Sequence, residues 1–244
     1  MGLTLYTNGC SWTWGGGIDV PQDNNVTNGR FMSEARSKVV WPHHLGKLLN
    51  ASDVVNLSMG CGSNERIFRT TFDWLLQQDE KTLKNTVAVI QLTENSRYEY
   101  YSTDKQEEVY LGNSIDWRLV KIGHTVGENH SQDLHKTAQE RYKLWSNTQD
   151  MYASLNYIAA LQNLFHSYNV KCYFWTYTGK WLRYPPEIKN YLDRFYPTFL
   201  DKPWRYSHND LFKYEQVSNT DSHPSLAGHV QIAQLIHDCI SNNK

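Results

Sequence analysis

Short apolar runs alternate with amphipathic stretches along most of this chain, and this alternation constrains the fold more than any other feature. The runs that resemble buried strands cover residues 3–6, 54–57, 87–92 and 170–177. Continuous apolar runs of this length are typical of parallel strands that are covered on both faces. A regular exchange of strand and helix predicts an α/β fold, in which helices flank a parallel sheet.

Helical periodicity marks the stretches between these runs. Apolar residues three or four positions apart form a stripe before the second, third and fourth runs, and again after Pro224. We expect about five strands, the fifth near 212–217. Two stretches, near 15–33 and 98–133, lack a clear period and are expected to be irregular insertions in a single domain spanning 1–244.

Composition narrows the classes of partner and cofactor. The 244 residues carry a formal net charge of −1, which gives no electrostatic reason to expect nucleic acid as a partner. The first residues lack both a basic segment and a long apolar run, so we expect a cytoplasmic or otherwise non-exported protein without a membrane segment. The four cysteines form no Cys-x-x-Cys pair and the histidines no His-x-x-x-His pair, so we expect no metal site.

Polar residues and glycines follow the predicted strands. Ser11 comes after the first strand, a glycine-rich turn at 58–64 after the second, and Asn95 after the third. The segment 221–225 precedes the final helix and contains Asp221 and His223. Because ligands bind at the carboxyl ends of the strands in open α/β sheets, we expect these segments to meet at one edge of the sheet.

These residue types together support acyl chemistry. A serine hydroxyl becomes a good nucleophile when a base takes its proton, and histidine is suited to that role. A carboxylate holds the imidazole in the required tautomer. A glycine N–H and an asparagine amide are suitable donors for the oxyanion that forms during attack on an ester.

The order of the motifs resembles that of the SGNH (GDSL-like) hydrolases. The motifs are Gly9-x-Ser11, Gly62-Ser63-Asn64, Asn95 and Asp221-x-His223-Pro224, and they span nearly the whole chain. The resemblance implies a three-layer α/β/α sandwich with a flavodoxin-like sheet, and ester hydrolysis without a cofactor. It also implies that Ser11 is the nucleophile, His223 the base and Asp221 its orienting carboxylate. The Ser11 N–H, Gly62 and Asn95 would then form the oxyanion hole.

The chain departs from this pattern at several positions. Cys10 stands where the family usually has aspartate, and its thiol is an alternative nucleophile. Cys61 is an alternative to Gly62 as the backbone donor. Asp221 precedes His223 by two residues, where the family more often has three. If the first two strands are neighbours, Cys10 and Cys61 are expected to lie near each other.

The expected reaction is hydrolysis of a carboxylic ester or O-acetyl group. The 16 tyrosines and 9 tryptophans suit a partly hydrated binding surface, so an acetylated carbohydrate is one expected substrate. A ligand-binding module without catalysis, and an acyltransferase that uses the same serine, are the alternatives. The sequence leaves the exact substrate and the oligomeric state open.

Overall fold

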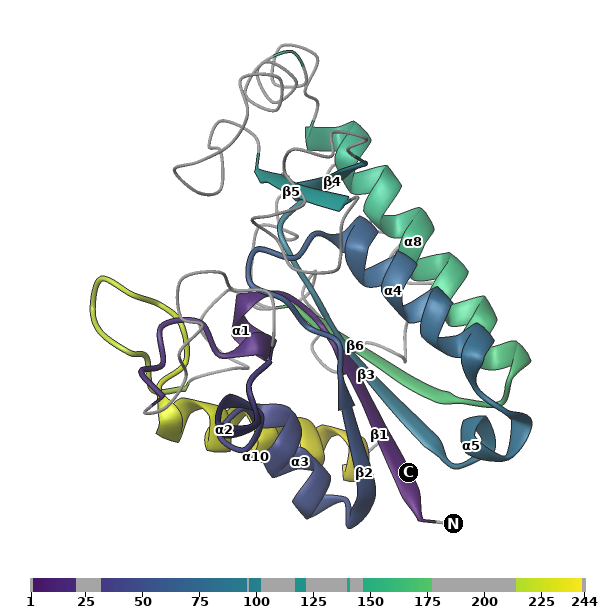
Figure 1. The fold of residues 1–244 in the computed structure, drawn as a ribbon, viewed down its shortest axis with the longest axis horizontal. Coiled ribbons are helices and arrows are strands. Elements are labelled where there is room, and N and C mark those ends of the chain that lie inside the picture. Colours follow the sequence, from purple (N-terminus) through teal and green to yellow (C-terminus); the bar gives the residue numbers. More distant parts are fainter. Residues whose placement is uncertain are drawn as a thin grey trace.

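The computed structural model describes residues 2–20, 32–95, 97–101, 117–121, 140, 147–176 and 214–242 (Figure 1). At its centre is a four-stranded parallel sheet in the order β2-β1-β3-β6. The strands are β1 (Leu3–Asn8), β2 (Ala51–Asn56), β3 (Thr86–Leu92) and β6 (Lys171–Thr176). The predicted α/β class and parallel sheet are confirmed, and β1 and β2 are neighbours as the site prediction requires.

Helices cover both faces of this sheet (Figure 1). On one face lie α4 (Asn64–Gln77) and α8 (Asn147–Ser167), and on the other α3 (Trp41–Leu48) and α10 (Leu226–Asn242). The described ranges also contain three short helices, α1 (Ser11–Trp14), α2 (Glu34–Ser37) and α5 (Glu80–Lys84). None of the helices in the described ranges is long and apolar enough to cross a membrane.

Alternation along the strands creates one hydrophobic core on each side of the sheet. Tyr6 and Phe174 belong to the core beneath α4 and α8, whereas their neighbours Leu5 and Trp175 belong to the core beneath α3 and α10. Successive side chains of a strand point to opposite faces, so a sheet covered on both sides needs apolar residues at almost every position. This requirement explains the continuous apolar runs in the sequence.

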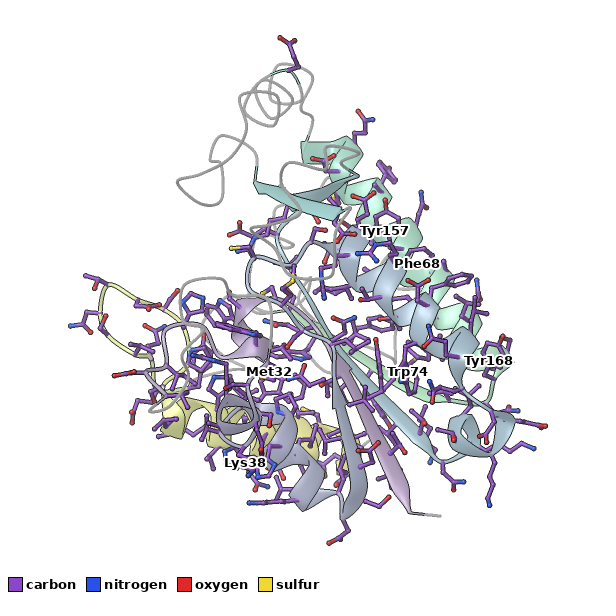
Figure 2. All side chains as sticks on the ribbon, viewed as in Figure 1. Met32, Lys38, Phe68, Trp74, Tyr157 and Tyr168 are labelled. Atoms are coloured by element: carbon purple, nitrogen blue, oxygen red, sulfur yellow. The ribbon has the colours of Figure 1, made fainter. Side chains whose placement is uncertain are left out.

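Aromatic contacts join α4 to its neighbours in the first core. The Phe68 ring of α4 stacks on Tyr157 of α8 with 5.2 Å between centroids, and Figure 2 shows both side chains between the two helices. Trp74 stacks on Tyr6 of β1 at 4.2 Å. Helix α4 is therefore packed both on the sheet and on α8.

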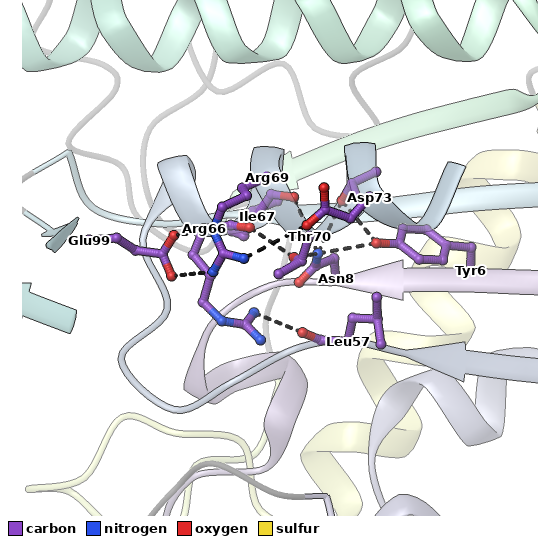
Figure 3. A network of polar contacts seen from close by, with 10 residues as sticks. Tyr6, Asn8, Leu57, Arg66, Ile67, Arg69, Thr70, Asp73 and Glu99 are labelled. Carbon is purple, nitrogen blue, oxygen red and sulfur yellow. Dashed lines mark hydrogen bonds and ion pairs between the residues drawn. The ribbon is translucent and has the colours of Figure 1, made fainter. Parts of the chain in front are cut away.

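A buried polar network holds the carboxyl end of β1 against α4 (Figure 3). The Asn8 amide donates to Thr70 Oγ1 at 2.8 Å and to Thr71 Oγ1 at 3.1 Å, and its oxygen accepts from the Gly9 N–H at 2.9 Å. The Tyr6 hydroxyl donates to Thr71 at 2.9 Å. Buried polar groups need such partners, and here they fix the chain just before Ser11.

Two expectations for the less regular segments need correction. The described part of the proposed fifth strand, 214–217, joins no parallel sheet, because Gln216 makes only an isolated antiparallel bridge to Pro224. Within the stretch expected to be irregular, β4 (Arg97–Tyr101) pairs antiparallel with β5 (Trp117–Lys121). Residues 212–213, 21–31 and the rest of 98–133 lie outside the described residues.

Helix α4 holds the β4–β5 hairpin. Arg69 makes two 2.8 Å contacts with the buried Glu99 carboxylate, and Glu65 accepts from the Glu99 N–H at 3.0 Å. A paired arginine–carboxylate contact of this kind is directional, so it sets the orientation of β4 relative to α4.

His229, in the first turn of α10, caps the beginning of α3. The Trp41 N–H donates to His229 Nδ1 at 3.1 Å, and the N-cap residue of α3 is Val40, which has no side-chain acceptor. His229 is fully buried, and burial, followed by nearby positive charge, lowers its pKa to about 3. The neutral ring is therefore the form that joins the two helices.

We expect His229 to make the protein less stable as the pH falls. Its ring has a pKa near 6.5 when unfolded, so below that pH the unfolded chain binds a proton that the folded chain excludes until about pH 3. Between pH 7 and pH 5, we expect the free energy of unfolding to fall by about 2 kcal/mol. His229→Gln keeps an acceptor for Trp41 and should remove most of this pH dependence in urea unfolding measured at pH 7 and pH 5. His166→Gln, at an exposed histidine of α8, is the control and should behave like the wild type.

Candidate functional site

Ser11 is the first residue of α1 and follows the carboxyl end of β1. Cys10, at the N-cap, has extended backbone angles (φ −101°, ψ −157°), so the chain turns sharply from strand into helix at the serine. The Ser11 N–H donates no hydrogen bond to any part of the chain that the structure describes. A serine in this first helical position therefore combines a hydroxyl with a backbone N–H that the helix itself leaves without an acceptor.

His223 and Asp221 lie in the loop before α10 and reach this serine. His223 Nε2 is 2.9 Å from Ser11 Oγ, and His223 Nδ1 is 2.6 Å from Asp221 Oδ1. The structure therefore brings the three predicted residues into one chain of hydrogen bonds across 212 positions of sequence. An imidazole in this position can accept the serine proton and make the oxygen nucleophilic.

The two-residue spacing between Asp221 and His223 works through a local turn. The His223 N–H donates to Asp221 Oδ1 at 3.0 Å, which turns the carboxylate back onto the ring of the same residue. This backbone hydrogen bond, and then the bond from the imidazole, lower the pKa of Asp221 below its usual value. Asp221 is therefore a carboxylate in the neutral pH range.

The Cys10 side chain points away from Ser11, His223 and Asp221 and toward Gln91. It is fully buried, and its thiol lies 3.7 Å from Gln91 Oε1, which also accepts from the Thr13 hydroxyl at 2.5 Å. The hydroxyl that meets the imidazole belongs to Ser11. The geometry thus favours Ser11 over the alternative nucleophile Cys10.

Gly62, one of the predicted oxyanion donors, lies near the start of α1 but has its N–H bonded within a turn. Gly62 lies beside Cys10, since a Cβ added to it would be 3.6 Å from Cys10 Cα, but its N–H donates to Met59 O at 3.0 Å. This N–H is therefore engaged in a turn. Cys61, the alternative, has a left-handed backbone (φ 62°) in the same turn.

Asn95 is held by a second asparagine. Its amide oxygen accepts from Asn64 Nδ2 at 3.5 Å, and Asn64 also exchanges hydrogen bonds of 2.8 and 3.0 Å with the backbone of Thr93. The N-cap of α4 is the neighbouring Ser63, whose hydroxyl accepts from the Arg66 N–H at 3.1 Å. Asn64 instead ties the end of β3 to α4.

A glycine segment, residues 15–17, forms a wall against the three residues. Gly15 and Gly17 have positive φ angles of 90° and 75°. A Cβ added to Gly16 would lie 3.0 Å from Ser11 Cβ and 3.0 Å from the ring of His223, and one added to Gly17 would lie 2.6 Å from Asp221 Oδ2. No spacing rule for catalytic residues marks this segment, although three successive glycines signal an unusual backbone path.

Aromatic rings line another side of the imidazole. The Trp12 ring centroid is 5.7 Å from that of His223, and Trp12 meets Tyr214 edge to face at 5.4 Å. Together with the glycine wall, these rings restrict the orientations that His223 can adopt. Among the described residues, no group of three His, Cys, Asp or Glu side chains is arranged to hold a metal ion.

The fold and the site define an α/β protein with a hydrogen-bonded Ser–His–Asp arrangement at the carboxyl end of a parallel sheet. The chain belongs to a family of unknown function, DUF6071, whose model matches residues 19–174. The matched segment includes Gly62 and Asn95 and ends before Asp221 and His223, while Ser11 precedes it. No curated protein sequence matches the chain.

Several solved structures resemble the chain over nearly all of its length at low identity. A carbohydrate esterase is 12% identical with a TM-score of 0.44, covering 99% of this chain and 69% of its own. A hydrolase from the metagenome of Lake Arreo, Spain, is 14% identical with a TM-score of 0.45, covering 98% and 96%. Phospholipase A1 from Streptomyces albidoflavus is 10% identical with a TM-score of 0.40, covering 98% and 99%.

Proposed function

We propose that this chain is a serine ester hydrolase of the SGNH type. The observation that carries the proposal is the 2.9 Å contact between Ser11 Oγ and His223 Nε2, with Asp221 on the other ring nitrogen at 2.6 Å. A serine–imidazole contact within about 2.6–3.2 Å is the geometry that general-base catalysis requires. The proposed roles are nucleophile for Ser11, base for His223 and orienting carboxylate for Asp221.

The reaction follows from the positions of the protons. The hydrogen bond to Asp221 keeps a proton on His223 Nδ1, so Nε2 is available to accept the Ser11 proton as Oγ attacks the ester carbonyl. His223 then returns that proton to the departing alcohol, which leaves an acyl group on Ser11. A water molecule, deprotonated in turn by His223, attacks this acyl group and releases the carboxylic acid and free serine.

The oxyanion that forms in each attack needs donors. The Ser11 N–H is the first that we assign, because no described group accepts it. Asn95 is the second proposed donor, through its amide nitrogen, as the resemblance to the SGNH hydrolases implies. Gly62 contributes to this oxyanion hole only when the hydrogen bond from its N–H to Met59 O is broken.

The proposed substrate is an acetyl ester, with acetylated carbohydrate as the specific class. This choice rests on the high tyrosine and tryptophan content and on the partly exposed Tyr214 beside Trp12 and His223. Acetate release from a partly acetylated oligosaccharide, compared with a chromogenic butyrate or octanoate ester, tests the class. Faster turnover of the long acyl chains would contradict it.

A serine-directed fluorophosphonate tests the proposed mechanism. We expect the reagent to modify the protein once, at Ser11, and to abolish hydrolysis of a chromogenic acetate ester in proportion to labelling. Peptide mass spectrometry locates the adduct. Labelling at another residue, or complete labelling without loss of hydrolysis, would refute the assignment.

Gly16→Ala is expected to lower kcat by about 10²-fold, because a small displacement of reacting groups has an effect of this size. The added methyl would lie 3.0 Å from both Ser11 Cβ and the His223 ring, so one of them must move. Lys38→Ala, at an exposed position in the neighbouring segment, is the control and should retain wild-type kcat. A Gly16→Ala enzyme with unchanged kcat would show that the wall does not constrain the pair.

A further inference from the structure

Arg36 is a charged residue that the proposed reaction does not use, yet its side chain is among the most buried of the described residues. It belongs to α2, is 1% exposed, and is presented by a helix that Ser33 caps through its hydroxyl. Its guanidinium donates to the carbonyl oxygens of Gly15 and Ile18. The Arg36 Cζ atom also lies 4.2 Å from the centroid of the Trp14 ring.

All three contacts fall on the segment 14–18, which contains the glycine wall of the site. This segment turns away from α1 through two residues with positive φ and has no regular secondary structure beyond Trp14. Its backbone bonds to the nucleophile run from the Gly15 and Gly16 N–H groups to Ser11 O, at 2.8 and 2.6 Å. A glycine backbone has many accessible conformations, so it needs an external group to hold one of them.

The shape of the guanidinium suits this task. Its planar fork donates in two directions, and its face can stack on an aromatic ring. Here, one side chain bonds to the first glycine of the wall, Gly15, and to Ile18, which follows the last, and it stacks on Trp14. A lysine has a single charged nitrogen and cannot reproduce all three contacts.

We propose that Arg36 is a positioning residue, which fixes the glycine wall against Ser11, His223 and Asp221 and thereby sets the geometry of the proton transfer. Arg36 holds the backbone at 15–18 in one conformation, and Gly16 in turn restricts the positions of Ser11 and the His223 ring. The proposal concerns the orientation of His223 and rests on the proposed function only where it predicts turnover.

Arg36→Lys tests the proposal, with Arg69→Lys as the matched control. Arg69 also makes a two-pronged contact, with Glu99, but through α4 and the β4–β5 hairpin. We expect Arg36→Lys to lower kcat for an acetate ester by about 10- to 10²-fold, with KM changed less than about threefold, as for misplaced reacting groups. Arg69→Lys should keep kcat within about twofold, the size of change for a site without contact to the reacting groups.

The NMR titration of the His223 ring supplies a readout that needs no substrate. We expect the ring nitrogen shifts and the titration midpoint of His223 to change in Arg36→Lys and to match the wild type in Arg69→Lys. A purely structural role would lower the unfolding midpoint of both variants without moving this titration. Arg36→Lys with wild-type kcat and His223 titration would overturn the proposal.

A milder variant covers the case in which Arg36→Lys does not fold. Ser33→Ala removes the cap that holds α2 and should shift the His223 titration in the same direction by a smaller amount. An unchanged titration in that variant would also count against Arg36. If the fluorophosphonate fails to label Ser11 while Arg36→Lys shifts the titration, the hydrolase proposal fails and the positioning role stands.

Discussion

Ser11→Ala is expected to lower kcat for ester hydrolysis by about 10⁶-fold, the loss seen when a triad nucleophile is removed. The variant loses the oxygen that lies 2.9 Å from His223 Nε2 and keeps the backbone N–H of residue 11. The remaining rate should come from the oxyanion donors and substrate binding alone. Progress curves with a chromogenic acetate ester at high enzyme concentration would measure both rates.

The double variant with His223→Ala sharpens this test. If Ser11 and His223 act as a unit, removing both should cost no more than removing either one, because neither works without the other. A double variant about 10³-fold slower than each single variant would mean that the two residues act independently. Unfolding curves for all three variants would show whether the loss reflects chemistry or folding.

The strands of the sheet were predictable to different degrees. The inner strands β1 and β3 coincide closely with apolar runs at 3–6 and 87–92, because both of their faces are covered. At the edge of the described sheet, β2 begins at Ala51 and includes the exposed Ser52 and Asp53, so its first half has no apolar signature. The β4–β5 hairpin was missed because the polar and aromatic residues of this stretch show no clear period, and the contacts of Glu99 with α4 leave no signal in the sequence.

The part of the candidate site that could be predicted from the sequence consists of residues that belong to the ordered motifs. Ser11, Asp221 and His223 are brought together as expected, and their catalytic roles stay predictions. Gly16 and Arg36 were not found, because their contacts join segments that are separate in the sequence and follow no fixed spacing. The hydrogen bond from the Gly62 N–H to Met59 O was likewise invisible, since glycine in a motif reveals its position and not the state of its N–H.

Asp221→Ala is expected to lower kcat by about 10⁴-fold, close to the cost of removing the carboxylate from other serine triads. Without Asp221, nothing described holds the proton on His223 Nδ1, and the charge that stabilises the protonated imidazole is gone. Burst kinetics with a chromogenic ester would separate acylation from deacylation, and both steps should slow because both use the imidazole. A fall in kcat of less than about tenfold would mean that a residue other than Asp221 orients His223.

Asp221→Asn should lower kcat less than Asp221→Ala does, because of the geometry of the turn that contains this residue. The His223 N–H donates to the same oxygen, Oδ1, that accepts from the His223 ring, at 3.0 and 2.6 Å. That N–H needs an acceptor, so the amide of the variant is held with its oxygen toward His223, and the required tautomer survives. We expect kcat to fall by about 10²-fold, short of the 10⁴-fold typical when the wrong tautomer forms. Equal losses for the two variants would mean that the amide nitrogen faces the ring instead.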